Sequence, residues 1–218
     1  YLGAIVSAYI GAKLAGLSAL LVVPLAVIGA MVVGGIYAFI PGWLKVKLKV
    51  NEVITTIMMN TIAIYLCAYL SNGPWKTSQG NRVSGTDPLA ANLQFPKLIR
   101  GSNLTTAIFA SAVLAILIWY VMSKTTTGYE MQLSGQNPRF ARFAGLNVDR
   151  LVIGAMAVSG ALCGLAGLLL VGGSDHTITT TIAGGRGFTA IMVSWLAKVY
   201  PFSMILTSFL IVFLSRGA

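Results

Sequence analysis

Residues 124–150 read KTTTGYEMQLSGQNPRFARFAGLNVDR, a polar passage between two apolar runs that are each long enough to cross a bilayer. Gly135, Pro138 and Gly145 interrupt any helix that forms there. The passage carries four basic and two acidic residues, which are Lys124, Arg139, Arg142 and Arg150 against Glu130 and Asp149. We predict that it forms a short cytoplasmic helix across the ends of membrane helices, where another protein can push on it.

Apolar runs without a charged residue occupy most of the chain outside this passage. The four long runs are 14–44, 53–75, 101–123 and 151–174, and the shorter ones are 1–12, 187–197 and 199–215. Mean hydropathy is +0.83 and charged residues make up 9% of the chain, against about 25% in soluble domains. We therefore predict an all-α, polytopic membrane helical bundle. Because both ends lie in apolar sequence, we expect 1–218 to be one transmembrane domain of a longer chain.

The net charge of +10 has a simple explanation in this setting. Basic residues sit at the ends of apolar runs, where they orient membrane helices and meet lipid headgroups, so we expect lipid and not nucleic acid as a partner. Three of them follow the first long run, Lys45, Lys47 and Lys49, and are predicted to anchor it on the cytoplasmic side. The 72–100 segment is expected to be an external loop, although it carries four basic residues of its own.

Helix signals and a polar stripe mark the 53–75 run. Asn51 is a predicted N-cap, and Glu52 follows in the first turn, where the helix dipole favours a carboxylate. The small or polar residues Thr56, Asn60, Ala63 and Cys67 recur at helical spacing and are expected to face inward.

This stripe is our predicted solute pathway. We place Thr56, Met59 and Asn60 along it and Glu52 near its inner mouth, since neutral donors and acceptors suit an uncharged sugar or nucleoside better than an ion. The alternative is that Asn60 and the threonines only form hydrogen bonds with neighbouring helices.

Small residues predict where helices pack closely. Gly160, Gly164 and Gly167 form a ridge in the 151–174 run, and Gly34 belongs to a second small-residue region in the first run. Pro41-Gly42 is expected to end that first span.

The 187–197 run covers only about 17 Å as a helix, so we read it as a re-entrant half-helix surrounded by protein.

The sequence gives little support for ATP binding, metal binding or catalysis by this chain. No glycine-rich phosphate loop with a following Lys-Ser/Thr is present, so the chain is not expected to bind ATP in that way. One histidine and two separated cysteines are too few for a metal site, and Cys67 and Cys163 are expected to be buried thiols. Consecutive Ser174, Asp175 and His176 do not readily converge as a catalytic triad, so no catalytic residues or cofactor are predicted.

Three motifs resemble the permease subunits of ABC importers in the branched-chain amino acid, ribose and nucleoside permease family. The first is GWLKVKLKVNEVITTIMMN at 42–60, which is very similar to the nucleoside-type branch. The second is GYEMQLSGQNPRFARFAGLNVDR at 128–150, continued by MAVSGALCGLAGLLLVGG, and it resembles the family's cytoplasmic coupling segment. The third, AGGRGFTAIMVSWLAKVYP, resembles the family's Gly-Phe half-helix region. Phe140, Trp195 and Ala197 depart from the usual family residues.

The resemblance implies a multi-pass permease domain in the bacterial cytoplasmic membrane. Its expected partners are a second permease subunit, an ATP-binding cassette ATPase that holds the ATP, and an extracytoplasmic substrate-binding protein. Residues 124–150 become the coupling segment, in which Gly135 and Pro138 fix the entry and Arg139 and Arg142 meet acidic or polar groups on the ATPase. The alternative is that these arginines only bind lipid phosphates. The full set of predicted coupling residues is Gly135, Asn137, Pro138, Arg139, Phe140, Arg142, Phe143 and Gly145.

A stand-alone channel or secondary transporter for a small polar solute is the alternative. An ion-coupled carrier needs a charged residue deep in a span, and the four long runs contain none. A membrane enzyme is less favoured still, because no acid–base pair is placed to work.

Overall fold

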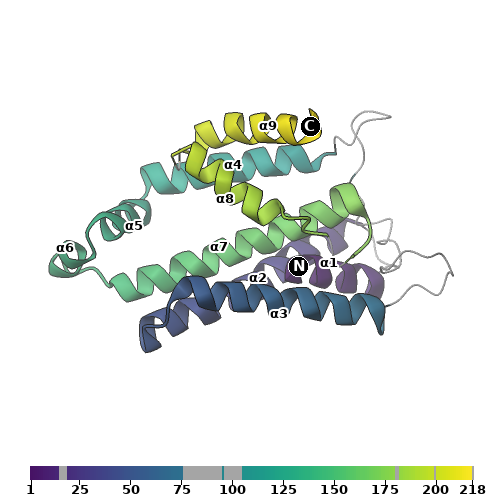
Figure 1. Ribbon diagram of the computed structural model, residues 1–218, viewed down its shortest axis with the longest axis horizontal. Coiled ribbons are helices and arrows are strands. Elements are labelled where there is room, and N and C mark those ends of the chain that lie inside the picture. The colour runs from purple at the N-terminus through teal and green to yellow at the C-terminus, as the bar shows by residue number, and fades with distance from the viewer. Residues whose placement is uncertain (15–18, 76–94, 96–104, 180–181, 199, 218) are drawn as a thin grey trace.

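The computed structural model describes residues 1–14, 19–75, 95, 105–179, 182–198 and 200–217. Apart from turns and connections these residues form helices, and none of them lies in a β-strand (Figure 1). Within these residues, four helices are long and apolar enough to cross a membrane: Leu20–Leu48, Glu52–Asn72, Ala107–Lys124 and Val148–Gly173. The predicted polytopic helical bundle is therefore confirmed. The elements are α1 (Leu2–Lys13), α2 (Ala19–Leu48), α3 (Glu52–Asn72), α4 (Ala107–Lys124), α5 (Thr126–Gln136), α6 (Pro138–Phe143), α7 (Val148–Leu170), the π-helical turn η2 (Val171–Asp175), α8 (Arg186–Leu196) and α9 (Pro201–Gly217).

The core of the bundle is the contact of α2 with α7, against which α1 also packs. Glycines bring the two backbones together: a Cβ atom added at Gly160 would overlap the Gly34 carbonyl oxygen, and one at Gly164 would overlap that of Ala30. Gly167 lies against α1 in the same way, with the position of its absent Cβ 3.1 Å from the backbone nitrogen of Ala4. Because small residues allow this close approach, dispersion contacts hold the three helices without bulky side chains.

Helix α2 does not end at Pro41-Gly42, so that prediction is wrong. The helix continues to Leu48 with Pro24 and Pro41 inside it. A proline removes one helical hydrogen bond, but tertiary packing continues past it, because Gly42 lies against Met156 and Ile153 of α7. The lysines at 45 and 47 therefore form the last turn of α2, where the helix dipole favours cations.

One end of the bundle gathers the α2–α3 turn, the end of α4, both short helices α5 and α6, and the start of α7 (Figure 1). Helix α5 folds back on α4: the Gln132 amide nitrogen donates to the Met122 carbonyl at 3.0 Å, and Gly128 is buried against the last turn of α4. The predicted single helix across the membrane-helix ends is instead two helices, α5 and α6. The chain turns between them because Asn137 has an extended backbone and caps α6.

Helices α8 and α9 pack against each other, and both expose large apolar side chains. Helix α8 has 11 residues, in agreement with the half-helix length read from the sequence. It begins after Gly184 and Gly185, which both have positive φ angles that glycine adopts at little cost.

Candidate functional site

A cavity of about 500 Å³ lies between α2, α3 and α7, next to the start of α1. It is lined by Tyr1, Leu2, Gly3, Gly34, Tyr37, Ala38, Pro41, Thr56, Met59, Asn60, Ala63, Ala155, Met156, Ser159, Gly160, Cys163 and Gly164. Its volume falls within the range of about 300–1,000 Å³ that small-molecule sites occupy. The closely packed glycines Gly34, Gly160 and Gly164 are part of its lining, so α2 and α7 supply two walls and α3 supplies the third.

The cavity lining carries no charged side chain among the residues described. Most of the wall is apolar, with two methionines, Met59 and Met156. Methionine side chains adapt to irregular shapes and contact aromatic rings favourably. Such a wall suits a neutral solute that has both polar groups and an apolar or aromatic face.

Thr56 and Asn60 are the polar groups that α3 contributes. The Thr56 hydroxyl donates to the carbonyls of Glu52 and Val53 at 2.8 and 3.0 Å, so its proton is already used in a hydrogen bond within α3. Within the described part of the chain, no protein group bonds the exposed Asn60 amide. A carboxamide offers two donors and an acceptor, so Asn60 can exchange hydrogen bonds with a solute in the cavity.

Tyr37 on α2 reaches across to α3. Its hydroxyl donates to the backbone carbonyl of Met59 at 2.6 Å, in a partly buried setting. The bond joins α2 to α3 through two residues that are 22 positions apart in the chain. Tyr37 therefore closes one side of the cavity with its ring while its hydroxyl is engaged by the backbone of α3.

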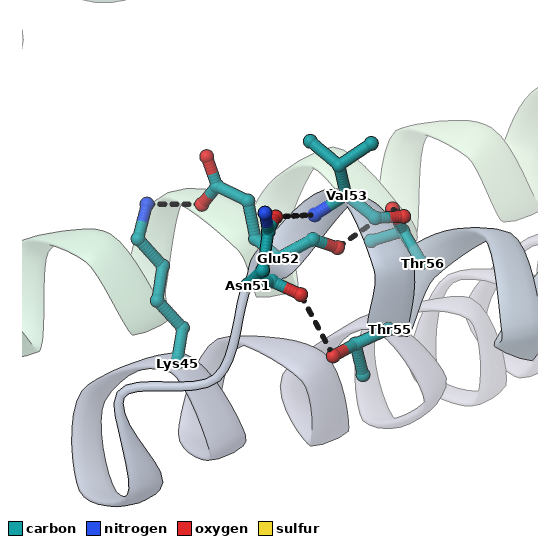
Figure 2. Close-up of polar contacts among 6 residues, drawn as sticks. All are labelled: Lys45, Asn51, Glu52, Val53, Thr55 and Thr56. Carbon is teal, nitrogen blue, oxygen red and sulfur yellow. Dashed lines mark hydrogen bonds and ion pairs between the residues drawn. The ribbon is translucent and has the colours of Figure 1, made fainter.

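Glu52 does not line the cavity, although Thr56, Met59 and Asn60 do. Its carboxylate forms an ion pair with Lys45 of α2 across the α2–α3 turn (Figure 2). Asn51 caps α3 as predicted, because its side-chain oxygen accepts from the Val53 amide at 3.0 Å. Together these contacts hold the α2–α3 turn at the end of the molecule where α5 and α6 lie (Figures 1 and 2).

The α5–α6 segment brings the sequence-predicted coupling residues to one end of the bundle. Asn137 accepts from the Phe140 amide at 3.1 Å, and Pro138 occupies the first turn of α6. Gly135 lies near the end of α5 with no neighbouring atom within 4 Å of an added Cβ, while Gly145 has φ +82° after α6. Thus Asn137 and Gly145 set the chain direction at the two ends of α6.

The two arginines of α6 have different surroundings. Arg142 donates to the Asp149 carboxylate of α7 at 3.1 Å, and both side chains are exposed. Arg139 is also exposed, and no described residue pairs with it. Beside them Phe140 is 55% and Phe143 is 91% exposed, an unusual position for phenylalanine at a polar end of a membrane protein.

The cavity residues that sequence reasoning missed include Tyr37, Ser159 and Cys163. Helical spacing places each on a shared face, since Gly34, Tyr37 and Pro41 are spaced by three and four, and so are Met156, Ser159 and Cys163. The spacing does not show that these faces border a cavity. The expectation that both cysteines are buried is correct for Cys67 and wrong for Cys163, which is exposed and lines the cavity. Apolar neighbours in the sequence conceal Cys163, because its exposure depends on a gap between helices.

The predicted external loop at 72–100 lies mostly outside the described residues. Its beginning continues α3 to Asn72, and the Trp75 ring stacks on Tyr9 of α1 with centroids 6.0 Å apart. The Phe95 amide donates to the Gly172 carbonyl at 2.8 Å. Nothing in the structure tests the remainder of the loop.

Fold and cavity together define the class: a polytopic membrane protein with an uncharged cavity among its closely packed helices. Residues 1–218 match the family described as "Branched-chain amino acid transport system / permease component". The chain belongs to this family of permease components.

Three similar proteins are also named as permease proteins. The guanosine ABC transporter permease protein NupP of Bacillus subtilis is 32% identical over 89% of this chain and 57% of its own length. The nucleoside ABC transporter permease protein NupB of Lactococcus lactis is 30% identical over 91% and 57%. The glucose ABC transporter permease protein TsgB13 of Haloferax volcanii is 32% identical over 90% and 54%. The chain thus spans about half the length of these relatives. No solved structure matches it.

Proposed function

We propose that this chain is the membrane-spanning permease domain of an ATP-driven importer that passes a small uncharged solute, a nucleoside in the first instance. The observation that carries the proposal is the uncharged cavity of about 500 Å³, with the Asn60 amide on its wall unbonded by any residue that the structure describes. An uncharged site admits a neutral solute without the cost of burying a charge that has no partner.

The substrates in the relatives' names narrow the class of solute. Guanosine, nucleosides and glucose are all neutral and rich in hydrogen-bonding groups. The methionines and the Tyr37 ring favour a solute that also has a flat aromatic face, because sulfur and aromatic side chains contact such faces well. A nucleoside combines these features, whereas a hexose has only the polar ones.

The proposal places the α5–α6 end on the cytoplasmic side. Lys45, Lys47, Lys49 and Lys124 lie at that end of α2 and α4 (Figure 1), in keeping with the positive-inside rule. There the exposed pair Phe140 and Phe143, with Arg139, form a compact apolar and basic surface on which an ATPase subunit can dock. ATP is bound and hydrolysed by that subunit.

Further parts of the importer follow from the same proposal. A second permease subunit completes the pathway, an extracytoplasmic binding protein delivers the solute, and the assembly resides in the bacterial cytoplasmic membrane. Residues 124–150 act as the coupling segment, 72–100 as an external loop, and α8 as a re-entrant half-helix. A stand-alone channel is the competing function, and co-purification of an ATPase with the full-length protein separates the two.

Uptake of radiolabelled guanosine, glucose and leucine by the complete importer tests the solute and the pathway. Replacing Asn60 with Leu should reduce guanosine uptake at least tenfold, about 1.4 kcal/mol, because the solute loses its amide partner. Thr56→Val should reduce guanosine uptake less, since the Thr56 hydroxyl proton is already bonded to a carbonyl of its own helix.

Thr61→Val is the matched control. Thr61 also bonds its own helix, to the Ile57 carbonyl at 3.0 Å, but does not line the cavity. Guanosine uptake by the Thr61→Val importer should equal that of the unaltered protein. Unchanged guanosine uptake in the Asn60→Leu importer, at equal membrane abundance, would remove Asn60 from the pathway.

A further inference from the structure

Helix α3 is the least firmly seated wall of the cavity. Its buried residues, Ala63, Cys67 and Ser71, all lie in its second half, away from the α2–α3 turn. At the level of the cavity Thr56 and Asn60 are exposed. Helices α2 and α7, in contrast, meet backbone to backbone along the glycines. A bond between α2 and α3 at this level would therefore fix the position of α3, the third wall of the cavity.

The hydrogen bond from the Tyr37 hydroxyl to the Met59 carbonyl is such an interhelical bond. A carbonyl in the middle of a helix already accepts an intrahelical bond and has a second lone pair to offer. The tyrosine bond at 2.6 Å uses it without breaking the helix. Because the acceptor belongs to the backbone, the bond holds the helix itself and not a single mobile side chain.

The bonded carbonyl immediately precedes Asn60 in the chain. Fixing the Met59 backbone therefore fixes the rotation of α3 about its own axis, and with it the direction in which Asn60 and Thr56 project. All of these residues line the same cavity. One tyrosine side chain thus spans from α2 to the backbone of α3 at this level.

We propose that Tyr37 is a positioning residue that sets the width of the cavity and aims Asn60 into it. Its role in selecting a solute rests on the proposed function, but its role in placing α3 does not. Without the bond, α3 moves away from α2 more often, so the cavity opens and discriminates less sharply among neutral solutes.

The native cysteines provide a test that needs no solute. Cys163 lines the cavity and is exposed, whereas Cys67 is fully buried on α3. Tyr37→Phe keeps the ring and deletes the hydroxyl. In the detergent-purified full-length protein, it should raise the rate of Cys163 alkylation by N-ethylmaleimide about threefold, as expected from loss of a typical interhelical hydrogen bond of about 0.6 kcal/mol in a membrane protein.

Tyr65→Phe is the matched control, because Tyr65 is also a tyrosine but is 71% exposed and does not line the cavity. It should leave the Cys163 rate unchanged. An unaltered Cys163 rate in Tyr37→Phe would overturn the proposal. So would an equal increase at Cys67, since that would show general unfolding and not displacement of one wall.

Transport measurements separate this inference from the proposed function. In the complete importer, Tyr37→Phe should raise the KM for guanosine more than it lowers kcat, and should admit bulkier N-substituted nucleosides. If the unaltered importer carries no nucleoside while the alkylation result holds, the solute assignment fails and the positioning role stands. If guanosine is carried but Tyr37→Phe changes neither KM nor the size limit, Tyr37 does not select solutes.

Discussion

Gly34 of α2 and Gly160 of α7 face each other so closely that a Cβ atom on either glycine would overlap the carbonyl oxygen of the other. One turn further along, a Cβ atom on Gly164 would overlap the carbonyl oxygen of Ala30. These contacts make α2 and α7 a rigid pair, since neither backbone can approach or rotate without a clash. The cavity is built on this pair.

Gly160→Ala should destabilise the protein by about 1–3 kcal/mol, the usual cost of overpacking a close contact. Gly154 on the same helix is the control, because an added Cβ there meets nothing within 4 Å. Gly154→Ala should be neutral or slightly stabilising, as alanine favours the helix. Thermal unfolding in detergent measures both. Equal melting temperatures for the two variants would show that the α2–α7 contact has room for a methyl group at Gly160.

Arg142 and Arg139 should respond differently to charge reversal. Arg142→Glu places a second carboxylate beside Asp149. The ion pair between α6 and α7 is then lost, and α6 is held less firmly against α7. Both groups are exposed, so the change in coupled ATP hydrolysis should be modest, roughly two- to fivefold.

Adding Asp149→Arg to Arg142→Glu restores opposite charges and should recover most of the coupling. Arg139→Glu should not be rescued by the same second change, because Arg139 has no partner among the described residues. ATPase stimulation by the loaded binding protein, in the reconstituted importer, measures all four variants. Rescue of Arg139→Glu by Asp149→Arg would contradict the assignment of the ion pair.

Asn137→Ala should loosen α6 without unfolding the bundle. Loss of the bond from the Phe140 amide to the Asn137 side chain costs about 1 kcal/mol, which corresponds to roughly fivefold faster amide exchange in residues 139–143. Gln136→Ala is the neighbouring control, since Gln136 does not cap α6. Hydrogen exchange with mass spectrometry resolves this segment. Unchanged exchange would mean that α6 is held by its other contacts.

A solute in the cavity should protect Cys163 from alkylation. At a guanosine concentration about ten times its Kd, the rate should fall roughly tenfold, because the free cavity is then about one-tenth populated. Cys67 supplies the internal control, as it is buried in the absence of solute. Protection by leucine but not by guanosine would overturn the nucleoside assignment while leaving the cavity as a binding site.

Much of the fold could be predicted from local patterns. The four spans follow from uninterrupted apolar runs, and the start of α3 follows from Asn51, whose side chain does bond the Val53 amide. Local patterns failed at Pro41, where packing of Gly42 on α7 carries the helix past a residue that ends most helices. They failed again at Cys163, whose exposure comes from a gap between helices that no neighbour in the sequence reveals.

The sequence by itself determined that the chain crosses a membrane as helices, since hydropathy and charge act on each segment separately. It also determined that Thr56 and Asn60 share one face of α3, because helical periodicity is a local property. Only the tertiary structure decided which helices that face meets, that Tyr37 bonds the Met59 backbone, and that Glu52 turns to Lys45. Spacing defines a face of a helix, whereas the neighbour of that face is chosen by the packing of the whole bundle.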